Sequence, residues 1–130
     1  MTSGPSSKPR ILVVEDEPDL RGMLQRILST IAEVAVANDG IDALERIRAG
    51  FTPDLIVSDV MMPRMDGLTL AKELKKDSAL ARVPLVMLTA KTAAKDVIAG
   101  INAGARAYVT KPFKTDELLS KVKKALGQKK

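Results

Sequence analysis

The sequence predicts an α/β fold, in which a doubly wound parallel sheet carries helices on both faces. Two observations lead to this fold class. Short apolar runs alternate five times with segments of helical periodicity, and the connections between them are short. The chain is 45% hydrophobic but holds only two Phe, one Tyr and no Trp, so its core is aliphatic. A length of 130 residues fits one domain.

The strands are expected where apolar residues cluster between turn residues. They lie near 10–15, 33–37, 54–58, 84–89 and 107–110. The helices follow from apolar residues that recur at three- and four-residue spacing. They are expected over 18–31, 42–50, 68–77, 94–105 and 116–127, with glycines closing the second and last of them.

Short polar residues stand where three of these helices begin. Their side-chain oxygens can accept hydrogen bonds from the free N–H groups of a first turn. Caps are therefore expected within Glu15–Glu17, within Asn38–Gly40, and at Thr115 with Asp116 and Glu117.

Polar residues also stand at the ends of four expected strands. They are Glu15 with Asp16, Asp59, Thr89 and Lys111. Parallel strands end on one edge of a sheet, and ligands of open α/β sheets bind outside that edge. Any one of these residues can be explained as a cap, but the whole set is not explained by capping. We therefore expect a single site that handles phosphate.

Carboxylates crowded at this edge would repel one another without a cation. Mg²⁺ (or Mn²⁺) prefers oxygen ligands and usually takes one or two carboxylates, here Asp16 and Asp59. Asp59 ends the central strand and is the candidate nucleophile, because a carboxylate can form an acyl phosphate. Lys111 and Thr89 would supply positive charge and a hydroxyl donor to the phosphoryl oxygens.

Composition excludes several other chemistries. The chain has no Cys and no His, which rules out disulfides, zinc sites built on these residues, Ser-His-Asp triads and a histidine phosphodonor within this chain. The net charge of +5 is concentrated at the ends, since residues 111–130 hold seven Lys against two acidic residues. We interpret this basic end as a solvated helix face, with a nucleic-acid patch as the lesser alternative.

The chain shows no targeting segment. No apolar stretch approaches the roughly 20 residues of a membrane span, and the N-terminus lacks the apolar region of a secretory signal. A cytoplasmic location is therefore expected. Residues 1–8 are expected to form a disordered leader or an expression remnant, 9–127 the domain and 128–130 a basic tail.

Four segments together resemble the receiver domain of bacterial two-component response regulators, of the single-domain chemotaxis type. They are ILVVEDEP, LIVSDVMMPRMDG, VMLTA and GARAYVTKPF, and the resemblance covers about residues 9–127. It implies a flavodoxin-like (βα)5 fold with strand order 2-1-3-4-5. It also implies a signalling switch that catalyses only its own phosphoryl transfer and slow autodephosphorylation.

The resemblance assigns roles to the residues of the site. Asp59 would accept a phosphoryl group from a sensor histidine kinase or a phosphotransfer protein. Glu15 and Asp16 would form the acidic pocket, with Glu15 acting through water, and Met61 would offer its backbone carbonyl to Mg²⁺. Thr89 and Lys111 would hold the phosphoryl oxygens.

Four further roles follow from the resemblance. Tyr108 would be the switch aromatic, although an edge aromatic with its hydroxyl in solvent is the alternative. Lys111-Pro112 would be a cis peptide. Met61 and Lys91 would tune how fast water attacks the acyl phosphate.

The output is expected to be a contact with a protein partner, because no DNA-binding or catalytic domain follows Gly127. The surface of the fourth helix, fifth strand and fifth helix would rearrange on phosphorylation. The chain would be a monomer, or would pair on phosphorylation through Lys95, Val97 and Ile98.

Three other functions remain as alternatives. An aspartate-nucleophile phosphatase would carry its nucleophile at the first strand, whereas here Asp59 follows the third. A pseudo-receiver would keep the fold without phosphorylation, which the complete residue set disfavours. A flavin-binding protein of the same topology would need a hydroxyl-rich phosphate loop and more aromatic residues.

Overall fold

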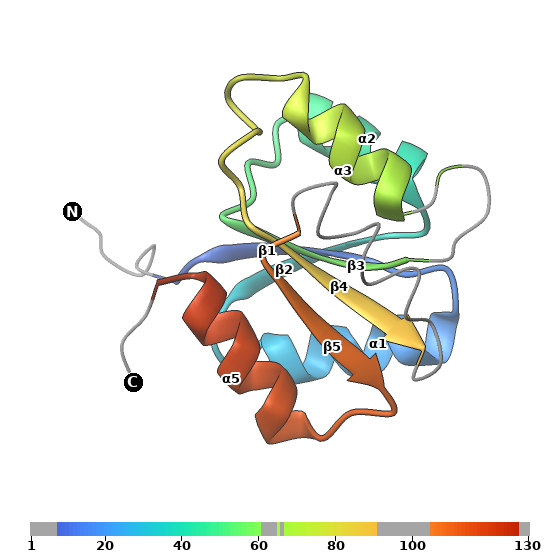
Figure 1. Cartoon of the computed structure of the whole chain (residues 1–130), viewed down its shortest axis with the longest axis vertical. Helices are drawn as coiled ribbons and strands as arrows, with labels where there is room; N and C mark the ends of the chain where they lie inside the picture. The colour runs from blue at the N-terminus through green and yellow to red at the C-terminus, as the bar shows by residue number, and fades with distance from the viewer. Residues whose placement is uncertain (1–7, 61–64, 66, 91–104, 128–130) are drawn as a thin grey trace.

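Five parallel strands form a single sheet in the order β2-β1-β3-β4-β5 (Figure 1). The computed structural model describes residues 8–60, 65, 67–90 and 105–127. The strands are β1 (Arg10–Val14), β2 (Glu33–Ala37), β3 (Leu55–Asp59), β4 (Leu85–Ala90) and β5 (Ala107–Lys111). This strand order confirms the flavodoxin-like fold class expected from the sequence.

Helices cover both faces of the sheet. Figure 1 shows α1 (Pro18–Leu28) and α5 (Thr115–Ala125) on one face, and α2 (Gly40–Arg48) and α3 (Gly67–Lys75) on the other. The helix expected over 94–105 falls almost wholly outside the described residues, so the labels pass from α3 to α5. None of the helices in the described ranges has the length and apolar character needed to cross a bilayer.

Alternate residues of each strand face opposite layers and build two separate cores. Ile11 and Val13 of β1 pack with residues of α1 and α5, among them Leu24 and Leu118. Leu12 and Val14 face the other way. They pack with buried residues of α2 and α3, which include Ala43, Leu44, Leu70 and Leu74. Burial on both faces explains why the strands read as continuous apolar runs.

The first helix is shorter than its periodicity predicts. It ends at Leu28 rather than at residue 31, because the chain tightens there: the N–H groups of Thr30 and Ile31 donate to the carbonyls of Ile27 and Leu28. Ile31 still packs against the core from this turn. Its apolar character therefore extended the helical pattern beyond the true end of the helix.

Two of the three expected caps are present. Glu17 accepts a hydrogen bond from the Leu20 N–H at 2.6 Å, and Asp39 accepts one from the Asp42 N–H at 2.9 Å. The prediction of a cap at Thr115 is wrong, since Thr115 is the first helical residue of α5. Lys114 occupies the cap position and makes no side-chain capping bond.

The start of α3 lies directly against the end of β3. The Gly67 N–H donates to the Val60 carbonyl at 2.9 Å, and the Val60 N–H donates to the Leu88 carbonyl at 3.1 Å. A Cβ atom at position 67 would collide with the backbone carbonyl oxygen of Asp59. Glycine is therefore required here to let α3 approach the strand that carries Asp59.

Candidate functional site

The expected site residues gather at the carboxyl edge of the sheet. Asp59 is the last residue of β3, and Lys111 is the last residue of β5. Glu15 follows β1 and extends its pairing with β2 by one bond, from the Glu15 N–H to the Ala37 carbonyl at 3.0 Å. Asp16 comes next, at the turn into α1. Thr89 lies inside β4, one residue before its end.

Three carboxylates form a cluster at this edge. Glu15, Asp16 and Asp59 each offer an oxygen atom, and these atoms lie within 4.8 Å of one another. Glu15 is 1% exposed and Asp59 is 8% exposed, whereas Asp16 is open to solvent. The cluster therefore has a buried floor and one accessible side.

Lys111 supplies the positive charge of the cluster. Its Nζ atom lies 2.6 Å from Oδ2 of Asp59 and 3.8 Å from Oε1 of Glu15. These contacts join β5 to β3, although β4 lies between the two strands in the sheet. One ammonium group beside three carboxylates leaves the site short of positive charge.

Burial makes Glu15 an unusual carboxyl group. It raises the pKa of Glu15 from 4.5 to about 7, and the negative charge of Asp59 adds to this increase, while the Glu17 N–H and Lys111 oppose it. Oε2 of Glu15 accepts the Glu17 N–H at 3.1 Å. Oε1 has no hydrogen-bond partner among the described residues. A buried acceptor without a donor favours either a proton or a cation.

The donor set fits a hard divalent cation such as Mg²⁺. All three side chains offer oxygen atoms, the charge deficit calls for a cation, and one buried oxygen lacks a partner. Met61, whose backbone carbonyl the resemblance adds to this set, lies outside the described residues. Lys91 lies outside them as well.

Thr89 and Tyr108 are neighbours on one face of the sheet. In the register of β4 and β5, Met87 stands opposite Tyr108 and Thr89 opposite Thr110. Because strand residues two apart share a face, Thr89 and Tyr108 are diagonal neighbours. Thr89 is 2% exposed. Thr89 and Tyr108 therefore lie on the same face of the sheet as Met87, which packs with α2 and α3.

The Tyr108 side chain points into the protein. Its ring packs against the core of α2 and α3, and its hydroxyl is buried without a hydrogen-bond partner among the described residues. Burial raises the pKa of Tyr108. The alternative of a hydroxyl in solvent does not hold for this conformation. The peptide bond between Lys111 and Pro112 is cis.

An apolar surface that the sequence analysis did not identify lies beside the site. A cavity of about 380 Å³ is lined by Leu20, Met23, Lys111, Pro112 and Phe113. Met23 is 36% exposed and is the large hydrophobic residue that stands out to solvent within the described ranges. Its position in α1, one residue before the buried Leu24, was the available signal. We call this surface the α1 apolar surface.

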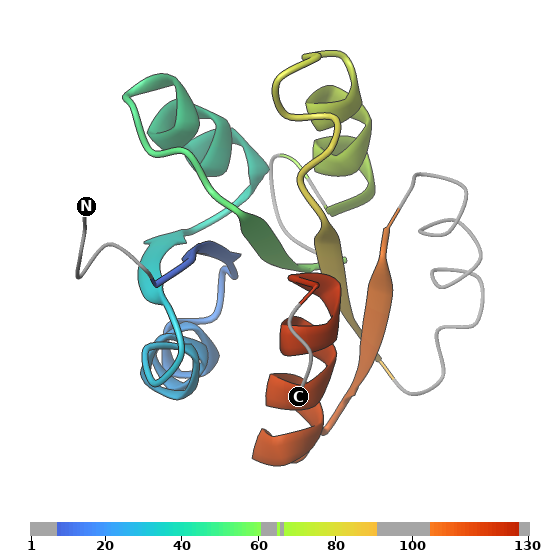
Figure 2. The same cartoon turned by 90° about the vertical axis from the view of Figure 1, so that its left-hand side faces the viewer.

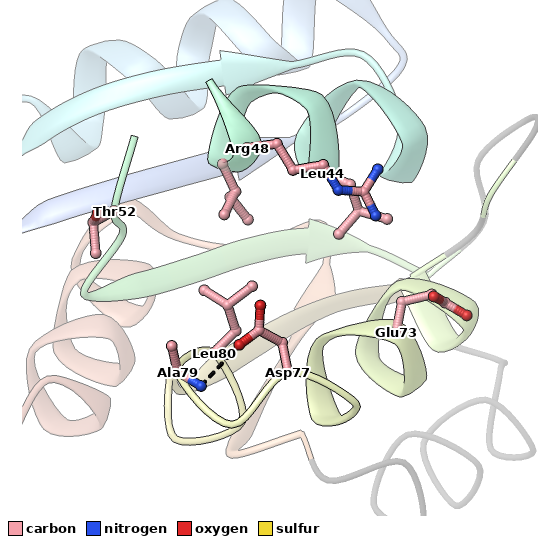
Figure 3. A pocket seen from close by; sticks show the side chains of 8 residues that line it. Leu44, Arg48, Thr52, Glu73, Asp77, Ala79 and Leu80 are labelled. Atoms are coloured by element: carbon pink, nitrogen blue, oxygen red, sulfur yellow. Dashed lines mark hydrogen bonds between the residues drawn. The ribbon is translucent and has the colours of Figure 1, made fainter. Parts of the chain in front are cut away.

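A different cavity lies at the opposite end of the sheet, between α2 and α3 (Figure 3). It measures about 290 Å³ and includes Thr52, which precedes β3, and Leu80, which precedes β4. Figure 3 shows Arg48 and Glu73 on the two facing helices. Since this cavity adjoins the amino ends of the strands, it is separate from the acidic cluster.

A family model described as "Response regulator receiver domain" matches residues 11–123. Among curated relatives, the DNA-binding response regulator MtrA of Mycolicibacterium smegmatis is 44% identical over 120 residues, which are 92% of this chain and 51% of that protein. The hybrid signal transduction histidine kinase D of Dictyostelium discoideum is 40% identical over 124 residues, which are 95% of this chain and 8% of that protein. The chain thus spans about half the length of the first of these relatives and less than a tenth of the second.

Solved structures show the same likeness. The receiver domain of sensor histidine kinase PA1611 from Pseudomonas aeruginosa PAO1, which has a magnesium ion coordinated in its active site cleft, superposes with a TM-score of 0.83 at 30% identity and covers 94% of this chain and 100% of its own. Chemotaxis response regulator CheY4 of Vibrio cholerae gives a TM-score of 0.84 at 31% identity, over 92% of this chain and 99% of its own.

Proposed function

Because this chain belongs to the family of response regulator receiver domains, which act in two-component signalling, we propose that Asp59 accepts a phosphoryl group from a sensor histidine kinase or a phosphotransfer protein. One observation carries the proposal. The Asp59 carboxylate ends the central strand, with Glu15 and Asp16 on one side and the Lys111 ammonium on the other.

The reaction transfers the group to a carboxylate oxygen. An oxygen of Asp59 attacks phosphorus, the P–N bond to the donor histidine breaks, and the electron pair of that bond leaves with the nitrogen. A new P–O bond joins the phosphoryl group to Asp59. Lys111 already reaches this carboxylate and can pair with the transferred oxygens, while the Thr89 hydroxyl donates from β4.

A divalent cation completes the charge balance of this site. Asp16 and Asp59 would hold Mg²⁺ directly and Glu15 through water, with the Met61 carbonyl added by the resemblance. When bound, Mg²⁺ neutralises negative charge on the phosphoryl group as it approaches the carboxylates. The exposed side of the cluster at Asp16 leaves an approach open from solvent.

The α1 apolar surface is the proposed docking place of the phosphodonor. It includes Lys111 itself, so a protein bound there would lie next to Asp59. Methionine is enriched in protein interfaces, and Met23 is exposed here beside the half-buried Leu20 and Phe113. A donor that covers Leu20, Met23 and Phe113 would also exclude water from the transfer.

The switch would act through Thr89 and Tyr108. When the phosphoryl group draws the Thr89 hydroxyl toward Asp59, the packing beside the Tyr108 ring changes, because the two are diagonal neighbours. The rearranged surface of the fourth helix, β5 and α5 would then be read by a downstream protein. Pairing through Lys95, Val97 and Ile98, which lie outside the described residues, would raise the sedimentation coefficient on phosphorylation.

Intact mass after incubation with Mg²⁺ and acetyl phosphate tests the phosphoacceptor. We expect a gain of one phosphoryl group in the wild type and in Asp77→Asn, a matched control at the far end of the sheet, and no gain in Asp59→Asn. A gain that persists in Asp59→Asn would place the phosphoryl group elsewhere. If the folded wild type gains no phosphoryl group from acetyl phosphate or from its kinase, the proposal is wrong and the chain is a pseudo-receiver.

A further inference from the structure

The cavity of about 290 Å³ between α2 and α3 is independent of the acidic cluster, because it lies at the opposite end of the sheet. Figure 2 shows the two helices side by side on one face of the sheet. Leu44, Ile47 and Leu80 give the cavity an apolar wall; Leu44 is buried and the other two are half-buried. Its volume lies near the lower end of the range for small-molecule sites. We call it the α2–α3 cavity.

Opposite charges line the two sides of the α2–α3 cavity. Arg48 is the last residue of α2, whereas Glu73 belongs to α3 and Asp77 to the turn after it (Figure 3). Within the described residues Arg48 forms no ion pair with either carboxylate, and Glu73 pairs instead with Lys76 at 2.9 Å. The cavity therefore offers a guanidinium group on one side and carboxylates on the other.

The turn after α3 fixes the position of one carboxylate. Oδ1 of Asp77 accepts the Ala79 N–H at 2.8 Å, the bond drawn in Figure 3. The Asp77 carbonyl accepts the N–H groups of Leu80 at 2.9 Å and Ala81 at 2.8 Å, so this turn is tightly bonded. The carboxyl ends of α2 and α3 each add about half a negative charge at the same end of the sheet. This side of the cavity therefore favours a positively charged group.

We propose that the α2–α3 cavity binds a free α-amino acid with an aliphatic side chain. The carboxylate of the amino acid would pair with the guanidinium of Arg48, whose planar donors match a carboxylate. Its ammonium group would lie against Glu73 and Asp77, and its side chain would cover the apolar wall. The inference does not rest on the proposed function, because none of these residues belongs to the acidic cluster.

The charges favour a zwitterion over a ligand with a single charge. A ligand that fills the cavity removes water from the charged groups around it, and a charged group that loses water needs a partner. An aliphatic amine would leave Arg48 without an anion, and an aliphatic acid would face Glu73 and Asp77 with a like charge. An aliphatic amino acid satisfies both sides and the apolar wall between them.

Leucine is the probe that tests this proposal. It is titrated to about 50 mM into the ¹⁵N-labelled full chain, because a ligand with so few atoms binds in the millimolar range. We expect saturating amide shifts at Ile47, Thr52 and Leu80, which line the cavity. The compounds 4-methylpentanoate and 3-methylbutylamine each lack one of the two charges of leucine. Both should bind about threefold more weakly or worse.

Arg48→Glu should reverse the ligand preference, because it replaces the partner of the carboxylate with a partner for the ammonium group. This variant should bind 3-methylbutylamine more tightly than leucine. Arg46→Glu is the matched control, since Arg46 is exposed on another side of α2 and does not line the cavity. It should keep the preference for leucine. Glu73→Gln serves as a second variant, should Arg48→Glu not fold; it should weaken leucine by about threefold and leave 4-methylpentanoate no weaker.

Three results would overturn the proposal. One is the absence of saturating shifts at the cavity when leucine is added. Another is equal binding of leucine and 3-methylbutylamine by the wild type, which would mean that the carboxylate is not recognised. The third is tighter binding, at the same residues, of a basic tripeptide with a central leucine and blocked ends, which would assign the cavity to a protein segment. Asp59→Asn should bind leucine as the wild type does, so this test and the phosphoacceptor test fail independently.

Discussion

The Nζ atom of Lys111 lies 2.6 Å from Oδ2 of Asp59, although 52 residues separate the two in the sequence. This ion pair joins the edge strand β5 to β3 across β4. It also means that the lysine already occupies one oxygen of the cluster before any divalent cation arrives. The lysine and the cation should therefore compete for the same carboxylates.

Replacing Lys111 with Met should strengthen Mg²⁺ binding while it weakens phosphorylation. Removing a positive charge a few ångströms from a divalent cation raises its affinity by about three- to tenfold in a solvent-exposed site. Phosphorylation should fall because no ammonium remains to pair with the phosphoryl oxygens. Calorimetric titration and intact mass measure the two effects. Lys114→Met, an exposed neighbour, is the control and should change neither; unchanged Mg²⁺ affinity in Lys111→Met would argue against competition.

The buried Glu15 predicts that the metal-free protein loses stability as pH rises. Its pKa is about 7 in the folded protein and 4.5 ordinarily, so the folded state keeps a proton that the unfolded state has released between these values. This contribution is fully present below about pH 4.5 and is lost as pH rises through about 7. Glu15→Gln cannot ionise and should lack this loss.

Urea unfolding in EDTA at pH 5 and pH 8 tests the role of Glu15. From pH 5 to pH 8, the free energy of unfolding of the wild type should fall relative to that of Glu15→Gln by on the order of 1–3 kcal/mol. Glu45→Gln, on the exposed face of α2, should follow the wild type. A wild type and a Glu15→Gln variant with the same pH dependence would remove Glu15 as the cause.

Gly67→Ala should destabilise the fold by about 1–3 kcal/mol, because the added Cβ meets the Asp59 carbonyl oxygen. Gly22→Ala is the matched control. A Cβ there would meet only Arg26 Nη1 at 3.6 Å, an ordinary contact within α1. That variant should gain roughly 0.5–1 kcal/mol from helix propensity. Equal behaviour of the two variants in urea unfolding would contradict the close approach of α3 to β3.

Tyr108→Phe should leave stability unchanged or raise it by up to about 1 kcal/mol. The hydroxyl is buried without a partner among the described residues, so its removal relieves a desolvation cost. Tyr108→Ala should instead lose about 1–3 kcal/mol, because the ring packs against the core of α2 and α3. Chemical unfolding separates the two. A marked loss in Tyr108→Phe would indicate that the hydroxyl has a partner.

The sequence predicted the sheet better than the ends of the helices. Strands buried on both faces leave short continuous apolar runs, which turn residues separate in this sequence. Helix ends depend on turns that periodicity does not report. Ile31 continues the apolar pattern of α1 but packs on the core from a turn. At α5, Phe113 packs against the core and the helix begins at Thr115, which puts Lys114 rather than the threonine at the cap position.

The position of the site residues followed from strand ends, but their individual environments did not. Glu15 and Asp16 are adjacent, yet one is buried and the other is exposed. The difference arises because Glu15 continues the pairing with β2, whereas Asp16 lies at the turn into α1. Likewise, Arg106 lies beside Lys121 and Lys124 of α5 around one cavity, and only the packing of helix on strand brings them together.

The hydrogen bond between Gly67 and Val60 gives the chain a closed ring next to Asp59, since the segment 61–66 leaves and returns at the same point. The ring is also held at Met65, because the Gly40 N–H donates to the Met65 carbonyl at 3.1 Å and the Met65 side chain packs against the core of α2 and α3. The place where Asp59 leaves the sheet is therefore tied to the first turns of two helices, so a change in how either α2 or α3 begins reaches the carboxylate through the backbone.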